Sequence, residues 1–337
     1  MDEFGTDAVG AATLGGMDVR PNPFAARGGV ALRPDLLAAG YDDRDLRTML
    51  RRGVWVRIRR GAYVESVVWE AMDDEGRHLL LCRAVQAVLA PPAVLSHSSA
   101  AVALGLPVWG VDLSVVHVTR PARGQGRHEA GVVHHVATLP AQHLRVVDGL
   151  RLTSPARTVL DLARTFGFEP GVVTADAALH RSLVSRQQLL ELHLACGDWP
   201  GARVAGRVVE FADGLAESVG ESRTRVLFLV EGLPKPRLQV RIWRGPVLLG
   251  RVDLYVDEAC TVVEFDGRMK YRIEPGDDPR KAADVLWAEK LREDDIRGEG
   301  HEFARVTWPD LDRPAATAQR LRVVFDRGRL LRRGWPA

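Results

Sequence analysis

Apolar and polar positions follow two repeats along this chain, one typical of helices and one typical of strands. Leu32 to Gly40 holds a short apolar run closed by glycine, which predicts a helix, and Tyr41 to Asp43 predicts a turn with an acidic N-cap. Arg44 to Arg52 predicts a second helix, with apolar side chains on one face and arginines on another. Val54 to Val64 alternates like a β-hairpin. This order predicts a winged helix-turn-helix over residues 29–72.

Arginines concentrate on the second helix and the hairpin. Seven of them stand against one acidic residue, Asp45, between positions 44 and 60. In a winged helix the second helix enters the major groove of DNA and the hairpin lies along phosphates. We therefore expect double-stranded DNA as a partner, bound by Arg44, Arg47, Arg51, Arg52, Arg57, Arg59 and Arg60. The alternative is a helical hairpin with a solvated arginine surface.

Residues 73–200 predict an α+β connecting domain, with helices at 77–89, 96–105 and 154–164 and strands at 114–119, 131–137 and 150–153. The cluster at 96–98, Ser-His-Ser, suggests a nucleophile, but no Gly-x-Ser-x-Gly motif accompanies it. We interpret Ser96 as a helix N-cap instead. The histidines at 134, 135 and 143 lack the spacing of metal ligands, and we interpret them as structural.

The C-terminal third predicts a separate α/β domain with a mixed sheet over residues 201–315. A helical repeat extends from 201 to 229, and strands at 238–243, 252–256 and 262–266, a charged helix at 280–298 and a strand at 302–308 follow it. A basic helix or tail is expected over residues 316–337.

Carboxylates interrupt the apolar strands of this domain. Asp253 lies within an apolar run, and Glu264 and Asp266 share one face of the next strand because side chains alternate along a strand. A buried carboxylate is costly unless it has a partner, and a divalent cation is the usual one. A set of oxygen ligands favours Mg²⁺ or Mn²⁺. The pattern therefore predicts a metal site on these strands.

The order helix, three strands, helix, strand is similar to that of PD-(D/E)xK nucleases. In those enzymes acids at these places hold Mg²⁺, which implies Glu221, Asp253 and Glu264 as metal ligands here. For Glu221 an ion pair with Arg225, four residues on in the same helix, is the alternative.

Four phrases in sequence order carry a closer resemblance: G-R-V-D-L-Y-V, V-V-E-F-D-G-R, E-K-L-R-E-D-D-I-R and F-A-R-V-T-W-P-D-L. They look like a domain family related to the very-short-patch mismatch repair endonucleases. That resemblance implies that Asp253, Glu264 and Asp266 form the core of the catalytic site, with Glu221 as a fourth acid.

One position departs from the nuclease pattern. The lysine expected two residues after Glu264 is replaced by Asp266. Lys270 and Lys290 are candidates for the missing ammonium group, and we favour Lys270 because Lys290 lies among charged residues on a predicted helix surface. The alternative is a nuclease fold that serves as a scaffold without catalysis.

The N-terminal region resembles a different family. The run from Leu32 to Val64, which ends R-R-G-V-W-V-R-I-R-R-G-A-Y-V, is similar to the winged-helix domain of AbiEi-type antitoxins, which bind DNA and repress their own operon. The phrases S-H-x-S-A-A and S-P-A-R-T-V-L-D-L-A also recur in actinobacterial AbiEi-like proteins. There the middle region is a connecting domain of unassigned role.

Composition narrows the class of protein. A chain of 337 residues predicts an α/β protein of two or three domains, and 46% hydrophobic with 27% charged residues is ordinary for a soluble protein. Three widely spaced cysteines argue against disulfides and zinc clusters and indicate a reducing, cytoplasmic location. Residues 1–28 predict a flexible leader, and no run has the length of a membrane span. The G-x-x-x-x-G-K-[ST] motif of nucleotide phosphate binding is absent.

Two hypotheses result. The first is a Mg²⁺-dependent DNA endonuclease that the winged helix targets to its substrate. The second is a non-catalytic antitoxin or transcriptional repressor of the AbiEi type, with a cognate toxin as a further partner and the C-terminal domain as a scaffold. The sequence leaves the oligomeric state and the recognised DNA sequence open.

Overall fold

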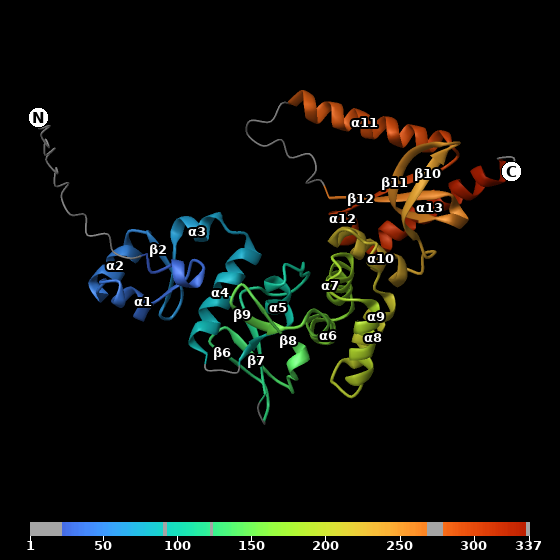
Figure 1. Cartoon of the computed structure of the whole chain (residues 1–337). Helices are drawn as coiled ribbons and strands as arrows, with labels where there is room; N and C mark the ends of the chain where they lie inside the picture. The colour runs from blue at the N-terminus through green and yellow to red at the C-terminus, as the bar shows by residue number, and fades with distance from the viewer. Residues whose placement is uncertain (1–21, 90–92, 122–123, 268–278, 335–337) are drawn as a thin grey trace, which may run out of the picture. The chain divides into compact units, whose positions relative to one another are not determined.

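The computed structural model describes residues 22–89, 93–121, 124–267 and 279–334 (Figure 1). The chain divides into two compact units, residues 1–87 and 88–337, which we describe one at a time. Lys270 and the expected leader up to residue 21 lie outside the described residues. The end of that leader is folded, because Phe24 is buried against the ring of Trp55. No described helix is both long and apolar enough to span a membrane.

The first unit contains a helix-turn-helix followed by a β-hairpin. Its elements are η1 Ala25–Arg27, β1 Ala31–Leu32, α1 Arg33–Ala38, α2 Asp43–Arg51, β2 Trp55–Arg59, β3 Ala62–Glu65, α3 Ser66–Ala71 and α4 Asp74–Val88. The strands form an antiparallel sheet in the order β1-β3-β2. This arrangement is consistent with the predicted winged helix.

Local interactions determine where α2 starts and where the hairpin turns. The Asp42 carboxylate accepts a hydrogen bond from the Asp45 amide at 2.7 Å, and the Asp45 carboxylate accepts one from the Asp42 amide at 3.1 Å. Gly61 has φ +76° and so permits the turn between β2 and β3. Leu46 and Trp55 are buried together, which directs the opposite face of α2 to solvent.

Helix α4 lies beyond the domain boundary expected at residue 73, yet its apolar face packs in the first unit. Leu80 and Ala84 share a core cluster with Leu32 and Val64. A helical apolar repeat shows that one face is buried, but it does not identify the element that covers that face.

The second unit begins with a six-stranded mixed sheet and five helices. The strands are β4 Val94–Leu95, β5 Val116–Arg120, β6 Arg127–Glu129, β7 Val132–Val136, β8 Leu144–Val147 and β9 Leu150–Thr153. The helices are α5 His97–Ala103, α6 Pro155–Phe166, α7 Phe168–His180, α8 Arg186–Ala195 and α9 Ala202–Phe211. The sheet order is β6-β7-β5-β4-β9-β8, with β5 parallel to β7.

Helix α6 carries a buried ion network. The Asp161 carboxylate is 0% exposed and accepts from the Nε of Arg157 at 2.8 Å and from the Nε of Arg164 at 3.0 Å. Both guanidinium groups stack on the indole of Trp199, with centroid distances of 4.2 and 5.2 Å. Arg157 also donates to the carbonyl of Thr138. The network connects α6 to the loops after β7 and after α8.

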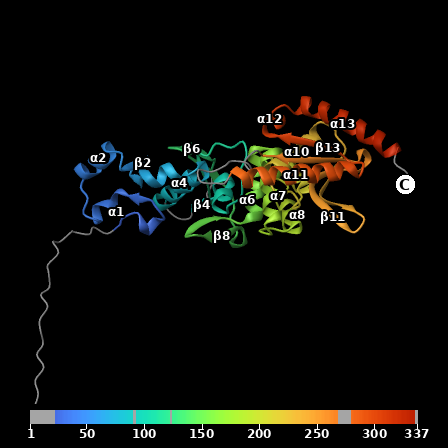
Figure 2. The same ribbon diagram turned by 90° about the horizontal axis from the view of Figure 1, so that it is seen from above.

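A second sheet, in the order β10-β11-β12-β13, occupies the C-terminal part (Figure 1 and Figure 2). Its elements are α10 Val219–Val230, β10 Arg237–Arg244, β11 Val247–Val256, η3 Asp257–Ala259, β12 Thr261–Asp266, α11 Pro279–Gly298, β13 Glu302–Thr307, α12 Trp308–Leu311 and α13 Pro314–Gly334. Strands β12 and β13 are parallel and the other pairs antiparallel, so the sheet is mixed as predicted. Helix α11 is the crossover between the parallel pair.

Helices cover both faces of this sheet. Phe228 of α10 and Phe325 of α13 pack on one face, and Ile296 of α11 packs with Phe303 on the other. The predicted basic tail is largely helix α13. Exposed arginines alternate with buried apolar residues along this helix, so its apolar side is part of the core. Helix α9, placed by the sequence in the C-terminal domain, shares the core of α6 to α8 through Val208 instead.

We expect Gly328→Ala to destabilise the C-terminal part by about 1–3 kcal/mol, the usual range for overpacking. A Cβ at Gly328 would overlap the carbonyl oxygen of Ala259, so α13 would have to move away from η3. Gly298→Ala, at the end of α11, is the matched control, since its Cβ would meet nothing closer than Arg244 at 3.8 Å. Urea unfolding followed by tryptophan fluorescence compares them; equal midpoints would contradict this packing.

Candidate functional site

The exposed face of α2 is basic. Arg44, Arg47 and Arg51 are exposed, whereas Leu46 on the opposite face is 4% exposed. Arg52 follows the helix and is exposed as well. The structure therefore gives α2 the amphipathic form that the sequence predicted.

The hairpin adds further cationic groups. Arg57 and Arg60 are exposed, and Arg59 is partly buried, which lowers its pKa from the usual value. None of the six exposed arginines on α2 and the hairpin makes an ion pair with a described residue: Arg44, Arg47, Arg51, Arg52, Arg57 and Arg60. Nearby Arg33, by contrast, pairs with Asp43 at 2.8 Å. The charges of the six exposed arginines are therefore available to a polyanion.

Four of the predicted acids line one pocket of about 860 Å³ in the second unit: Glu221, Asp253, Glu264 and Asp266. Glu221 comes from the first turn of α10, Asp253 from β11, and the other two from the end of β12. Arg251, Arg292 and Arg305 line the same pocket. The predicted convergence of these acids is present, and arginines accompany them.

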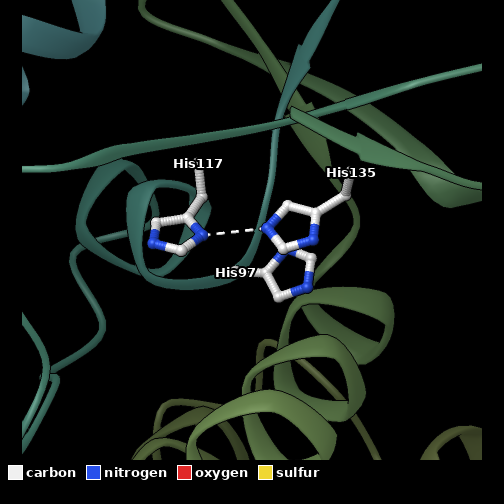
Figure 3. Close-up of side chains that lie close together, drawn as sticks. All are labelled: His97, His117 and His135. Atoms are coloured by element: carbon white, nitrogen blue, oxygen red, sulfur yellow. Dashed lines mark hydrogen bonds between the residues drawn. The ribbon is translucent and has the colours of Figure 1, made fainter. Parts of the chain in front are cut away.

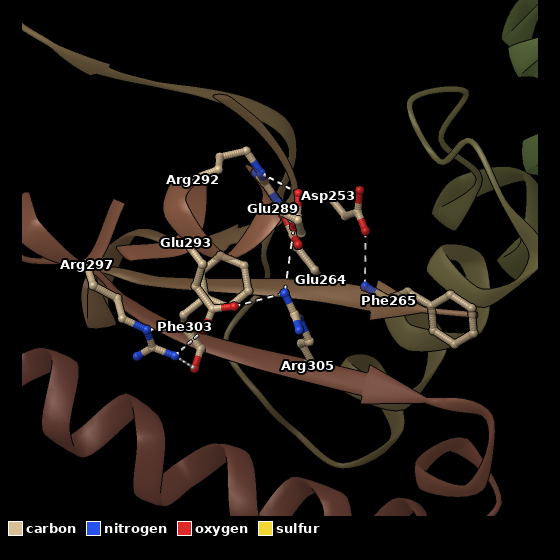
Figure 4. Close-up of polar contacts among 9 residues, drawn as sticks. All are labelled: Asp253, Glu264, Phe265, Glu289, Arg292, Glu293, Arg297, Phe303 and Arg305. Atoms are coloured by element: carbon tan, nitrogen blue, oxygen red, sulfur yellow. Dashed lines mark hydrogen bonds and ion pairs between the residues drawn. The ribbon is translucent and has the colours of Figure 1, made fainter. Parts of the chain in front are cut away.

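Each predicted metal ligand already has hydrogen-bond donors. Glu221 accepts from the Ser218 hydroxyl at 2.8 Å and from the Gln239 amide group at 3.0 Å. Asp253 Oδ2 accepts from the backbone N–H of Phe265 at 3.0 Å (Figure 4). The expected alternative for Glu221 does not occur, because Arg225 pairs with Asp176.

Glu264 accepts a hydrogen bond from an arginine that the sequence analysis did not single out. Arg292 of α11 donates to Glu264 Oε1 at 2.7 Å and to Glu289 at 2.5 Å (Figure 4). Lys290 is exposed, and its ammonium lies 5.8 Å from the ring centroid of Trp287. Residues two apart on a helix point in different directions, which explains why Arg292 lines the pocket while Lys290 is not among its lining residues.

Two acids of this pocket, Glu221 and Glu264, have raised pKa values. Burial raises the pKa of Glu221, and the negative charge of Asp253 raises it further. Burial also raises the pKa of Glu264; the Arg292 guanidinium opposes that shift and Asp253 adds to it. A cation in the pocket would relieve the repulsion among the three acids.

A second polar cluster lies in the connecting region, and the sequence analysis missed it. His97, His117 and His135 each offer a nitrogen, and these nitrogens all lie within 4.8 Å of one another (Figure 3). Among the described residues, these three are the group of potential metal ligands whose ligand atoms all lie this close together. His97 begins α5, and the other two lie on the paired parallel strands β5 and β7.

The tertiary structure corrects the interpretation of Ser96 and shows which of the neighbouring histidines belongs to the cluster. Ser96 precedes α5, but its hydroxyl does not cap the helix; it bonds to His97 Nδ1 at 2.9 Å and to the Thr119 hydroxyl at 2.8 Å. His135 faces His97 and His117, whereas the adjacent His134 lies on the other face of β7 because side chains alternate. The histidines are 20 and 18 residues apart, and no local motif indicates their proximity.

Comparison with known sequence families identifies two segments. Residues 20–66 match a family described as "Transcriptional regulator, AbiEi antitoxin". Residues 94–223 match one described as "AbiEi antitoxin C-terminal domain". These matches support the resemblance to AbiEi-type antitoxins. The first matched segment includes the basic helix α2, and the second includes the three histidines of the cluster. Neither extends past residue 223, so Asp253 and Glu264 lie outside them.

Two similar proteins come from Mycobacterium tuberculosis, the uncharacterized proteins Rv2248 of strain H37Rv and MT2308 of strain CDC 1551. Each is 29% identical to this chain over 233 residues, which is 64% of this chain and 82% of the relative. Their names assign no activity.

We expect Asp253→Asn to lower the pKa of both Glu221 and Glu264, because the Asp253 charge contributes to raising each. The asparagine oxygen can still accept from Phe265 N–H. As the pH rises through the raised pKa range, the folded carboxyls lose protons and the free energy of unfolding falls; this fall should be smaller in the variant. Carboxyl ¹³C titration measures the shifts.

Asp266→Asn is the control for that titration. Asp266 lines the same pocket, but its charge is not one of the principal causes of the raised pKa of Glu221 or Glu264. Unchanged pKa values in Asp253→Asn, or equal changes in both variants, would contradict the assigned coupling.

Proposed function

We propose that this chain is a DNA-binding transcriptional regulator of the AbiEi antitoxin type. The observation that carries the proposal is the set of six exposed arginines on α2 and the β2–β3 hairpin, which make no ion pairs with described residues. They lie in the segment that matches a regulator family. A cognate toxin as a second partner belongs to the same proposal, on the strength of the two antitoxin matches.

The physical basis of binding is charge and shape. An α-helix fits the major groove, and the exposed face of α2 carries Arg44, Arg47 and Arg51 on successive turns. The hairpin arginines would contact phosphates alongside. Each phosphate neutralised releases condensed counterions, so affinity should fall steeply as the salt concentration rises.

The double variant Arg47→Ala, Arg51→Ala tests the interface. Affinity for a duplex covering the region upstream of the chain's own gene should fall roughly tenfold or more, and the slope of log K against log salt should shrink by about 2. Fluorescence anisotropy at several salt concentrations measures both.

The matched control is Arg127→Ala, Arg145→Ala, which removes the same charge from exposed positions in the second unit. It should bind like the unmodified chain. If the α2 variant keeps its affinity and slope, or if both double variants weaken equally, α2 is not the DNA-binding element.

A second candidate function, metal-dependent hydrolysis of phosphodiesters, is favoured by one observation. Glu221, Asp253, Glu264 and Asp266 line a single pocket at the end of a mixed sheet. Oxygen donors of this kind suit Mg²⁺ or Mn²⁺, which would be held by Asp253 and Glu264 with Glu221 beside them. A bound ion of this kind supplies charge neutralisation at a phosphate and a more acidic water.

The residues themselves fit a cation only after two adjustments. Among the described residues the oxygens of Glu221, Asp253 and Glu264 do not form a group within 4.8 Å of one another, so they would have to move closer together. Arg292 occupies Glu264 Oε1, so an ion would use the other oxygen or displace the guanidinium. Asp266 does not replace the ammonium of a catalytic lysine, and Lys270 lies outside the described residues. Metal binding and catalysis are therefore tested separately.

Mn²⁺ titration by calorimetry tests the metal, and incubation of duplex, flap and mismatched DNA with Mg²⁺ or Mn²⁺ tests cleavage. This candidate expects binding and cleavage that are both lost in Asp253→Ala and in Glu264→Ala while DNA affinity survives. Metal binding without cleavage would indicate a scaffold. If the unmodified chain shows neither metal binding nor DNA cleavage, the second candidate function is wrong.

A further inference from the structure

The three histidines described above meet in a buried place that neither the DNA interface nor the acidic pocket uses. His97 is 0% exposed and His117 7% exposed, while His135 is partly exposed. The rings of His97 and His135 stack with centroids 3.7 Å apart, and those of His117 and His135 are 5.2 Å apart (Figure 3). Three imidazoles in one buried place need a chemical reason, because each buried ring nitrogen is costly unless it has a hydrogen-bond or metal partner.

Hydrogen bonding does not supply that reason in full. His117 Nδ1 and His135 Nε2 lie 2.9 Å apart, so one proton serves both nitrogens. His97 Nδ1 is held by Ser96, and His97 Nε2 is buried with no hydrogen-bond partner among the described residues. An unpartnered buried nitrogen costs about 1–3 kcal/mol. A ligand that takes lone pairs from nitrogen would satisfy all three rings at once.

We propose that His97, His117 and His135 bind one transition-metal ion of the Zn²⁺ class. Neutral imidazoles are preferred ligands of Zn²⁺, and three histidines with a fourth open position form a common zinc arrangement. In the metal-bound form Nδ1–H of His97 would donate to the Ser96 hydroxyl oxygen, so that Nε2 carries the lone pair for the metal. Thr119 donates to Ser96 at 2.8 Å and so holds that hydroxyl in place.

To accept the ion, one hydrogen-bonded pair of rings must open slightly and the third ring must turn. Zn–N bonds of about 2.0–2.1 Å place tetrahedral ligand nitrogens roughly 3.3 Å apart. The His117–His135 pair must therefore open by about 0.4 Å from its 2.9 Å hydrogen bond. The His97 ring must also leave its stack on His135 and turn Nε2 inward, and the Ser96 hydroxyl must follow Nδ1 to keep their hydrogen bond. The partly exposed edge of His135 provides access for the ion.

Neighbouring charges favour an anionic group or hydroxide at the fourth position. The charges of Arg164 and Arg157 act on His97, and the charge of Asp161 acts on His135. The single negative charge of Asp161 balances only one of the two arginines bonded to it, so one positive charge remains. A divalent ion beside the remaining positive charge would bind a negatively charged ligand more strongly than water.

The experiment is a Co²⁺ titration of the full chain, purified without a histidine tag and stripped with a chelator. Tetrahedral Co²⁺ absorbs strongly in the visible range and serves as a probe for Zn²⁺ sites. We expect one equivalent of Co²⁺ to produce that band, one equivalent of Zn²⁺ to abolish it, and Zn²⁺ to raise the melting temperature of the chain.

Three variants assign the site. His135→Ala should weaken Co²⁺ binding on the order of 100-fold or more, since even loss of an outer contact costs 10–100-fold. His128→Ala, an exposed histidine on the neighbouring strand β6, should bind like the unmodified chain. Asp253→Asn should keep the tetrahedral Co²⁺ band, whatever happens to a cation in the acidic pocket, and this separates the two sites.

The absence of a visible band from the unmodified, folded chain would overturn the proposal by itself, whatever the variants do. A band that persists in folded His135→Ala, or that is lost equally in His128→Ala, would overturn it as well. If circular dichroism shows that His135→Ala is unfolded, His135→Gln replaces it as a polar side chain that keeps the volume, with the same loss expected.

Discussion

The buried carboxylate of Asp161 is the constraint on which the connecting region depends. A charge without solvent must be paired, and removal of one partner of a buried pair typically costs about 3–5 kcal/mol. Asp161 satisfies this with Arg157 and Arg164, and Trp199 covers both guanidinium groups. Because Arg157 also bonds to Thr138, α6 can pack in one orientation against the sheet. That orientation places α6 beside the histidine cluster.

Charge compensation differs among the arginine surface of α2, the acidic pocket and the histidine cluster. On α2 the arginines project into solvent and make no ion pair with the residues that the structure describes, which suits a surface for a polyanion. In the acidic pocket burial raises the pKa of both Glu221 and Glu264, and Arg292 opposes that shift only at Glu264 and only in part. Around the histidines the neutral rings carry no counter-charge of their own, and burial lowers the pKa of His135 to about 4.

Local patterns predicted most of the elements but not their partners. The strand at 262–266 and the helix at 280–298 agree with β12 and α11 within about a residue. The acids of β11 and β12 converge because a period of two fixes their faces once the strands pair. Arg292 could not be selected over Lys290 in advance, since both are basic residues on one charged helix. Only the rotation of α11 against β12 decides between them.

The sequence by itself determined the amphipathic form of α2, the basic hairpin and the acidic residues of the strands, because each depends on a repeat of two to four residues. The tertiary structure alone decided that α4 packs in the first unit and that α13 closes the C-terminal core. It also brought His97, His117 and His135 together. The parallel pairing of β5 with β7 joins segments separated by a further strand, and no local spacing records such a contact.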